Sequence, residues 1–305
     1  PTANYNSFNN PQAALDYLRT VSPTAASPQV LKADGLASGK GVFICEDFPQ
    51  AEQALKEIFT DLKGGQVVIE EFLKGQEVSF IVATDGERIV PLAPSHDYKR
   101  IFENDRGPNT GGMGTVSPSP RLSGDMEKGL SELVIEPVLR EMRRRGMPFQ
   151  GFLYAGLMIG YGGEVNVLEY NARLGDPECQ VIMRRMESDL LEILLNLSSS
   201  GEQLPEVKWT PEHAVCVVLA AHGYPASPRA GDEINGIELA EQLSDCVVFH
   251  AGTKIDRQRL VTAGGRVMSV TATGPNIESA RNKAYRAASL IQFAGCQLRR
   301  DIGLS

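Results

Sequence analysis

The segment NVLEYNARLGDPE, residues 166–178, places a carboxylate, an amide and a guanidinium along one predicted strand and its exit. Glu169 and Asn171 are two residues apart, so a strand would direct both side chains to the same face. Two oxygen donors at this spacing suit a hard cation such as Mg2+ held against phosphates. Arg173 continues the same face, and its planar fork suits an anionic oxygen. The apolar residues that predict a buried strand here are Val165, Val167, Leu168 and Tyr170.

A salt-bridged strand end is the structural alternative for this segment. A glutamate on a buried strand is costly unless it has a partner or a ligand. This cost favours a functional role for Glu169 over a structural one.

Length and charge limit the class of protein. A chain of 305 residues is too long for one simple core, so two or three lobes are expected. The net charge of −8 disfavours a nucleic-acid partner or an anionic membrane surface. Five cysteines without CxxC spacing disfavour a zinc site and a disulfide framework. The chain has no long apolar run or signal-like start, which predicts a cytosolic protein, and its first residues resemble the interior of a domain.

The hydrophobic pattern predicts an α/β protein in three parts, residues 1–74, 75–198 and 205–305, with a polar linker around residue 200. The helices are expected at 11–20, 48–62, 125–145, 188–198, 237–243 and 277–291, with Ser188 as an N-cap. The first part has strands at 29–33, 41–45 and 66–72. The second has hairpins turning at Asp85-Gly86 and at Gly162-Gly163, and the third alternates strands with helices.

A glycine-rich hairpin in the first part carries two lysines. In KADGLASGKGV, residues 32–42, Lys32 stands at a strand end, and Gly35, Gly39 and Gly41 surround Lys40. Glycines let backbone N–H groups approach an anion closely, and lysine adds a point charge. The segment is not a Walker A loop, which requires Ser or Thr at position 41. A hairpin lying over a triphosphate fits it better than a mobile, solvated surface loop.

A strand, turn and strand at residues 67–80, VVIEEFLKGQEVSF, can present backbone groups to an adenine edge, and Glu77 can accept from ribose hydroxyls. In isolation this signal is weak, because paired glutamates are usually solvated.

Taken together, these segments resemble the ATP-grasp superfamily and, within it, the phosphoribosylamine–glycine ligase family. The resemblance extends over nearly the whole chain and rests on KADGLASGKGV, VVIEEFLKGQEVSF, GPNTGGMG, GFLYAGLMI, LEYNARLGDPE, MRRMESDL, FHAGTK, GGRV and the terminal RRDIG. It implies two lobes around an ATP cleft and a small C-terminal α/β domain. The implied reaction is an ATP- and Mg2+- (or Mn2+-) dependent ligation of glycine to 5-phosphoribosylamine by a monomeric cytoplasmic enzyme of purine synthesis.

The resemblance also implies roles for individual residues. Lys40, Arg173 and Asp176 would be catalytic, and Glu169 and Asn171 would hold the metal. ATP would be bound by Lys32, Gly35, Gly39, Lys40, Gly41, Glu70, Glu71, Phe72, Leu73 and Glu77. The substrates would contact Asp97, Lys99, Arg100, Asn109, Gly111, Gly112 and Arg173.

Three departures from the family pattern accompany this resemblance. The family's N-terminal domain is not among residues 1–305, the segment before Val67 is shorter than the family pattern, and Tyr98 stands where histidine is expected. A chain without that domain is expected to bind ATP and Mg2+ but to ligate poorly. The two alternatives are therefore an ATP-binding fragment without turnover and an ATP-grasp carboxylate–amine ligase with another acceptor.

Overall fold

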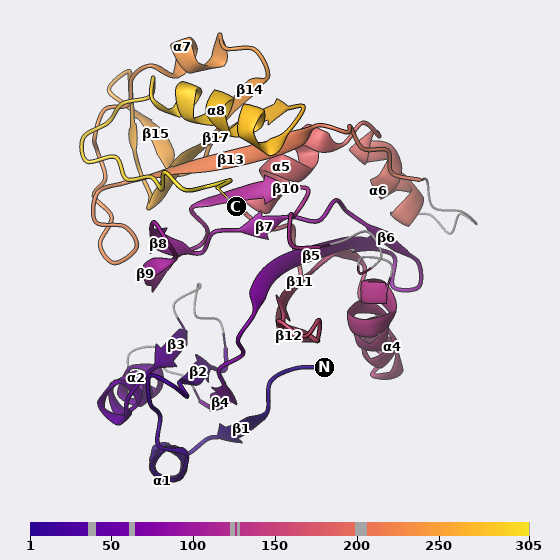
Figure 1. Ribbon diagram of the computed structural model, residues 1–305, viewed down its shortest axis with the longest axis vertical. Helices are drawn as coiled ribbons and strands as arrows, with labels where there is room; N and C mark the ends of the chain where they lie inside the picture. Colours follow the sequence, from indigo (N-terminus) through magenta and orange to yellow (C-terminus); the bar gives the residue numbers. More distant parts are fainter. Residues whose placement is uncertain (36–40, 61–64, 123–125, 127–128, 199–205, 305) are drawn as a thin grey trace. The chain divides into compact units, whose positions relative to one another are not determined.

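The computed structural model describes residues 1–35, 41–60, 65–122, 126, 129–198 and 206–304 (Figure 1). The chain forms two compact units. The first comprises residues 1–76 and 158–168, and the second comprises residues 77–157 and 169–305.

The first unit is an antiparallel sheet covered by two helices. The strands β1 (Tyr5–Phe8), β2 (Gln29–Ala33), β3 (Val42–Cys45) and β4 (Val67–Glu71) lie in the order β1-β4-β2-β3. Helices α1 (Pro11–Val21) and α2 (Phe48–Thr60) pack on the sheet, and Asn10 caps α1 by accepting from the N–H groups of Gln12 and Ala13. The buried side chains that form this core include Leu18, Leu31, Leu55, Ile58, Val67 and Ile69.

The main sheet of the second unit contains strands from distant parts of the chain. Its order is β14-β17-β13-β10-β7. Alternate residues of β13 face opposite sides: Val215 and Val217 pack with α8, whereas Ala214 and Cys216 pack with α5. The elements are β7 (His96–Asp97), β10 (Gly114–Ser117), α5 (Glu178–Arg185), β13 (His213–Ala220), α7 (Ile237–Glu241), β14 (Cys246–His250), β17 (Arg266–Gly274) and α8 (Ile277–Ala288).

A second sheet has the order β12-β11-β5-β6 and contains the two predicted hairpins. The strands are β5 (Gln76–Thr84), β6 (Ile89–Pro91), β11 (Gly151–Ile159) and β12 (Val165–Asn171). Two small hairpins complete the strands, β8 (Arg100–Phe102) with β9 (Arg106–Asn109), and β15 (Thr253–Asp256) with β16 (Arg259–Thr262). Helices α4 (Glu136–Arg144) and α6 (Leu190–Ser198) belong to the second unit.

The predicted long helix at 125–145 is not one regular α-helix. Residues Ser131–Ile135 form a π-helical turn, η1, between α-helical residues at 129–130 and helix α4, which begins at Glu136. Pro137 lacks the N–H that would bond back to residue 133, and its ring crowds that carbonyl. The wider π turn accommodates both effects. Residues 123–125 and 127–128 lie outside the described residues.

The predicted cap of the helix near residue 190 is also wrong. The helix begins at Leu190, and Asp189 accepts from the N–H of Leu191 at 2.8 Å. Ser188 instead accepts from the N–H of Lys208 at 2.8 Å. Aspartate is as good an N-cap as serine. Here Asp189 caps the helix, because the Ser188 side chain is bonded to Lys208.

The remaining predicted strands and helices lie within a few residues of their expected bounds. The three-part division expected from the sequence stays a prediction. Strands β7 and β10, which precede the predicted linker, share one sheet with β13, β14 and β17, which follow it. Among the described residues, no helix has the length and apolar character needed to cross a membrane.

Candidate functional site

Lys32 is the best-defined candidate phosphate ligand in the first unit. Strand β2 places its Nζ 2.7 Å from Glu70 Oε2 and 2.9 Å from the carbonyl oxygen of Leu168. An ammonium has three N–H donors, and contacts within the described residues use two of them, which leaves one for an anionic oxygen. The glutamate holds the lysine side chain in place. This arrangement suits a phosphate contact, although the role itself stays a prediction.

The other nucleotide candidates of the first unit lie at the end of strand β4, just after it, and in the glycine-rich hairpin. Phe72 and Leu73 are half-buried, whereas Glu71 is exposed and its Oε1 accepts from the N–H and amide of Asn4. This pair fastens β4 to the first residues of the chain. Gly41 closes the hairpin, since its carbonyl accepts from Ala33 N–H at 2.8 Å, and Gly35 has φ 130°. Gly39, Lys40 and the segment at 61–64 lie outside the described residues.

In the second unit, strand pairing brings the substrate candidates together. Register in the β7–β10 ladder opposes Asp97 to Thr115. The chain after β7 and the chain before β10 are also hydrogen-bonded, because Thr110 donates to the Lys99 carbonyl from both its N–H and its hydroxyl, at 2.8 and 2.7 Å. A pocket results, with walls formed by Glu77, Val78, Ser79, Asp97, Lys99, Tyr154, Gly156 and Leu157.

The pocket is lined by a buried carboxyl group, Asp97, and a half-buried lysine, Lys99. Lys99 Nζ lies 2.9 Å from Glu77 Oε2. Burial would lower the pKa of Lys99, but Glu77, Tyr154, Asp97 and Glu169 together raise it well above its ordinary value. Burial, and next the charge of Glu178, raise the pKa of Asp97 well above its ordinary value against the opposing effect of Lys99. Lys99 is therefore a fixed cation, whereas Asp97 can hold a proton.

Three pocket-side residues were not predicted as site residues. Ser79 Oγ donates to Glu178 Oε1 at 2.8 Å and lies 2.9 Å from the hydroxyl of Tyr154. Burial and the charge of Glu178 raise the pKa of Tyr154 well above its ordinary value, so the phenol stays protonated. Glu178 closes the LGDPE motif, which was the available sequence signal, but Ser79 and Tyr154 have no motif of their own.

A fourth residue missed by the sequence analysis is Arg266 of the GGRV motif. Its guanidinium NH1 donates to the carbonyl oxygens of Gly111 and Asp176, both at 2.6 Å, and NH2 lies 3.0 Å from Asp176 Oδ2. Because Gln180 Nε2 donates to the other carboxylate oxygen of Asp176 at 3.0 Å, both oxygens are occupied. This suits Asp176 to fixing a loop more than to proton transfer.

Gly112 lies where the two loops meet. A Cβ at this position would be 2.5 Å from Pro177 Cδ and 2.7 Å from Asp97 Oδ1, and its φ is 113°. Only glycine fits this conformation and this approach. The GPNTGGMG motif therefore lets the backbone reach the buried carboxylate.

The metal candidates lie on one face of β12, as predicted. Glu169 is exposed and Asn171 half-buried, and within the described ranges neither side chain has a hydrogen-bond or ion-pair partner. Their oxygens are therefore available to a hydrated Mg2+, which needs only one or two protein ligands besides phosphate and water. The residues present fit this ion.

Three expectations about this strand are wrong. Glu169 is exposed, so the cost of burying its charge does not argue for function, and Tyr170 is 37% exposed. Strand β12 ends at Asn171, so Arg173 lies beyond it and not on its face. Arg173 is exposed, and its NH1 donates to the Leu174 carbonyl at 2.8 Å. The hydroxyl of Tyr170 reaches the Val134 carbonyl at 2.6 Å instead of entering the core.

The last substrate candidates lie on the β8–β9 hairpin. Arg100 is opposite Asn109 in its register, and Arg100 NH1 donates to the Gly107 carbonyl at 2.6 Å. His96, next to Asp97 on β7, is buried, and its Nδ1 lies 2.9 Å from the Glu77 carbonyl. A carbonyl only accepts, so Nδ1 carries the proton. Burial, assisted by Arg121, lowers the pKa of His96 to about 4.

Comparisons with known proteins identify relatives along the whole chain. The family domain described as "Phosphoribosylglycinamide synthetase, ATP-grasp (A) domain" matches residues 1–179, and "Phosphoribosylglycinamide synthetase, C domain" matches residues 214–305. The phosphoribosylamine–glycine ligase of Vibrio vulnificus (strain CMCP6) is 45% identical over 307 residues, which cover 99% of this chain and 70% of the relative. The Escherichia coli K12 enzyme of the same name is 45% identical, with coverage of 99% and 71%.

Solved structures give the same result. Phosphoribosylamine–glycine ligase from Thermotoga maritima matches with a TM-score of 0.87 and 37% identity, over 99% of this chain and 74% of that one. The biotin carboxylase domain of Hydrogenobacter thermophilus 2-oxoglutarate carboxylase, solved with MgADP, has a TM-score of 0.70 at 15% identity, over 98% and 64% of the two chains. The second likeness concerns the fold alone.

Proposed function

The chain belongs to the phosphoribosylglycinamide synthetase family, and we propose that it catalyses the ATP-dependent ligation of glycine to 5-phosphoribosylamine. The products are glycinamide ribonucleotide, ADP and phosphate, as expected for de novo purine synthesis. The observation that carries the proposal is the match of both family domains, together with the grouping of Asp97, Lys99 and Gly112 around one pocket.

The chemistry requires activation of a carboxylate. A glycine oxygen attacks the γ-phosphorus of ATP, ADP leaves, and glycyl phosphate forms. The amine nitrogen then attacks the carbonyl carbon and displaces phosphate. Positioning, charge neutralisation and exclusion of water account for most of the rate enhancement in such a reaction.

Residues of this chain supply the positioning. Lys32 is proposed to donate its third N–H to a phosphate oxygen, and the ion pair with Glu70 holds the lysine side chain in position. Strand residues Glu70–Leu73 are proposed to contact adenine, and Glu77 the ribose. Glu77 also pairs with Lys99, so its carboxylate orients a cation next to Asp97. Glu169 and Asn171 would hold Mg2+, which neutralises charge on the transferred phosphoryl group.

The acceptor side is proposed to use the buried pocket. Lys99 and Arg100 attract an anionic group, and Asp97 can accept a proton or bind an ammonium group. Gly112 lies against Asp97 in this region, and Gly111 and Arg173 are proposed to border it as well.

A coupled assay of ADP release tests the function. Glycine and freshly prepared phosphoribosylamine together should give stoichiometric ADP and glycinamide ribonucleotide, whereas either alone should give little. Alanine, formate and bicarbonate, and ammonia in place of the amine, serve as alternative substrates. Turnover with one of these and none with the glycine pair would assign the chain to another carboxylate–amine ligase activity.

A further inference from the structure

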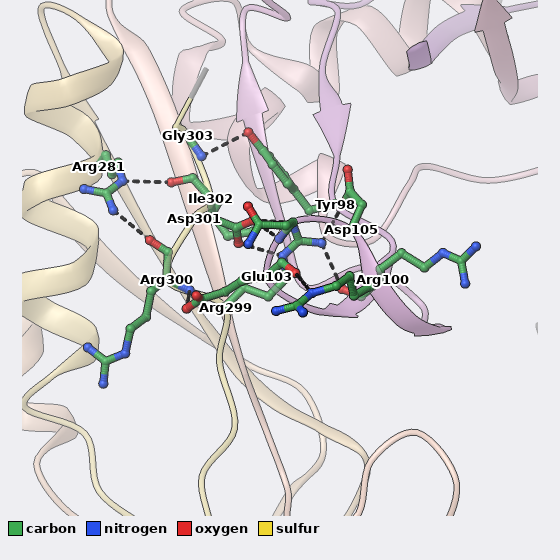
Figure 2. A network of polar contacts seen from close by, with 12 residues as sticks. Tyr98, Arg100, Glu103, Asp105, Arg281, Arg299, Arg300, Asp301, Ile302 and Gly303 are labelled. Carbon is green, nitrogen blue, oxygen red and sulfur yellow. Dashed lines mark hydrogen bonds and ion pairs between the residues drawn. The ribbon is translucent and has the colours of Figure 1, made fainter. Parts of the chain in front are cut away.

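Arg299, in the RRDIG segment near the C-terminus, is a buried cation held by four hydrogen bonds (Figure 2). Its side chain is only 1% exposed. Nε and NH2 donate to the two oxygens of Asp301 at 2.8 and 2.7 Å, and NH1 donates to Asp105 Oδ1 at 2.8 Å and to the Arg100 carbonyl at 3.0 Å. The guanidinium carbon lies 5.0 Å from the centre of the Tyr98 ring.

These contacts join the C-terminal segment to the chain between Lys99 and Asn109. Asn104 and Asp105 form the turn of the β8–β9 hairpin, and both have positive φ, 57° and 49°. Such angles are uncommon outside glycine and persist only where surrounding contacts maintain them. Asp301 Oδ2 accepts from the Asn104 N–H at 2.9 Å, so the segment holds the backbone of the turn as well as the Asp105 side chain.

The same segment also holds Tyr98, which lies between Asp97 and Lys99 in the sequence. The Gly303 N–H donates to the Tyr98 hydroxyl at 3.1 Å, and the ring is buried. Tyr98 therefore has a structural contact at the position where the family pattern has histidine, while its two neighbours line the pocket.

Helix α8 supports the segment from its other side. Tyr285 OH donates to the Arg299 carbonyl at 2.6 Å and accepts from the Ile302 N–H at 3.1 Å. Arg281 donates to the carbonyls of Arg300 and Ile302, at 2.7 and 3.1 Å. The segment is thus a rigid connection from α8 to the β8–β9 hairpin (Figure 2).

A buried charge contributes little net stability compared with apolar packing, although removing one partner of a buried pair is costly. The planar fork of arginine does, however, determine the direction of each bond. Its bonds to the Arg100 carbonyl and to Asp105 therefore restrict the hairpin to one position.

We propose that Arg299 is a positioning residue for the substrate subsite: it places the β8–β9 hairpin, and with it Lys99 and Arg100, to receive an anionic group. This inference rests on the proposed function. The anionic group is either the 5-phosphate of the amine or the carboxylate of glycine, and steady-state kinetics with each substrate varied separately distinguish the two.

Arg299→Lys is the main test variant, because it keeps the charge but cannot reproduce the fork. We expect KM for one substrate, the amine or glycine, to rise at least tenfold, while KM for ATP changes less than twofold. Arg300→Lys is the matched control, since the Arg300 side chain is exposed and its bonds to Glu103 and Arg281 are made by its backbone N–H and carbonyl. A rise confined to the amine identifies the phosphate, and a rise confined to glycine identifies the carboxylate.

Asp105→Ala is the second variant, in case Arg299→Lys does not fold. The Asp105 side chain is 60% exposed, and its loss leaves Arg299 paired with Asp301. It should raise the same KM by a smaller factor with an unchanged Tm. Equal changes in all three KM values, or unchanged KM values in a folded variant, would overturn the proposal.

Amide hydrogen exchange separates this inference from the proposed function. Residues 98–109 should exchange faster in Arg299→Lys and Asp105→Ala than in Arg300→Lys, whatever substrates the protein uses. Faster exchange without any ligase activity in the parent protein would reject the proposed function and keep the structural connection. Unchanged exchange would reject the connection itself.

Discussion

The candidate nucleotide residues of the first unit and the candidate substrate residues of the second are supported in different ways. Lys32 is held by Glu70 on the neighbouring strand β4 and by the backbone carbonyl of Leu168 on β12. Asp97 and Lys99 share a pocket with residues of β5 and β11, and the adjoining loops are fixed by Arg266 and Arg299. A flexible triphosphate tail needs charge and backbone amides, whereas a small substrate needs a preformed pocket.

The residues of the two sites also differ in how far apart they lie in the sequence. The nucleotide candidates of the first unit lie in one continuous motif and in the strand that pairs with it. The substrate pocket is lined by residues 77–79, 97, 99, 154, 156 and 157. Glu178 accepts from Ser79 beside it, and the adjoining loops are held by Arg266 and Arg299. Nucleotide binding should therefore change mainly with substitutions near its own motif, whereas substrate binding should also change with substitutions far away in the sequence.

The largest effect is expected at the metal candidate. Glu169→Gln keeps an oxygen but loses the negative charge, so turnover should fall by about a hundredfold or more at limiting Mg2+. The fold should be intact, because Glu169 is exposed. ADP release measured against Mg2+ concentration checks this, with exposed Glu164→Gln as the control. Parent-like turnover at low Mg2+ would show that Glu169 is not a ligand.

The next effect concerns ATP affinity in the first unit. Lys32→Ala removes a charge-assisted hydrogen bond, which contributes roughly 1.5–3 kcal/mol, and so should weaken binding of a non-hydrolysable ATP analogue about ten- to a hundredfold. Calorimetry provides the measurement. Lys74→Ala, in the same unit but exposed and bound only to the Ala26 carbonyl at 3.4 Å, should bind like the parent.

A third prediction concerns the pH dependence of stability in the second unit. The pKa of His96 is about 4 in the folded state, against an ordinary value of 6.5. Between these values the unfolded chain takes up a proton that the folded chain does not, so stability falls as pH falls. From pH 7 to pH 5 this contribution amounts to about 2 kcal/mol.

His96→Gln should remove that contribution. Urea unfolding at pH 7 and pH 5 should therefore show a smaller loss of stability on acidification for His96→Gln than for the parent. Exposed His250→Gln is the control and should follow the parent. An equal loss in all three proteins would contradict a buried, neutral His96.

The smallest effect is expected at Arg266. Arg266→Lys keeps the charge but cannot bond Gly111, Asp176 O and Asp176 Oδ2 together, so kcat/KM for the amine or glycine should fall by about tenfold or less. The Kd for the ATP analogue should be unchanged. Arg259→Lys, an exposed arginine with one 3.3 Å ion pair to Glu233, should leave both quantities unchanged.

Much of the fold followed from local patterns. Strand β2 was predicted at its observed bounds, and the turn at Asp85-Gly86 separates β5 from β6 as expected. Periodicity failed where a single residue changed the local geometry, as at Pro137, or where two adjacent polar residues competed for one cap, as at Ser188 and Asp189. It also overestimated the burial of Glu169 and Tyr170, because alternation indicates which residues share a face but not what covers that face.

The sequence by itself determined the family, the α/β class and the residue types available for phosphate, metal and substrate. These properties depend on short, contiguous motifs, which can be recognised without knowing the tertiary structure. Only the tertiary structure decided that β7 and β10 pair in a sheet with β13 and β17, that Ser79 and Tyr154 line up with Glu178, and that Arg266 and Arg299 support the pocket. The physical reason is that hydrogen bonds and buried charges join groups far apart in the chain, and no local pattern records which distant partner satisfies each of them.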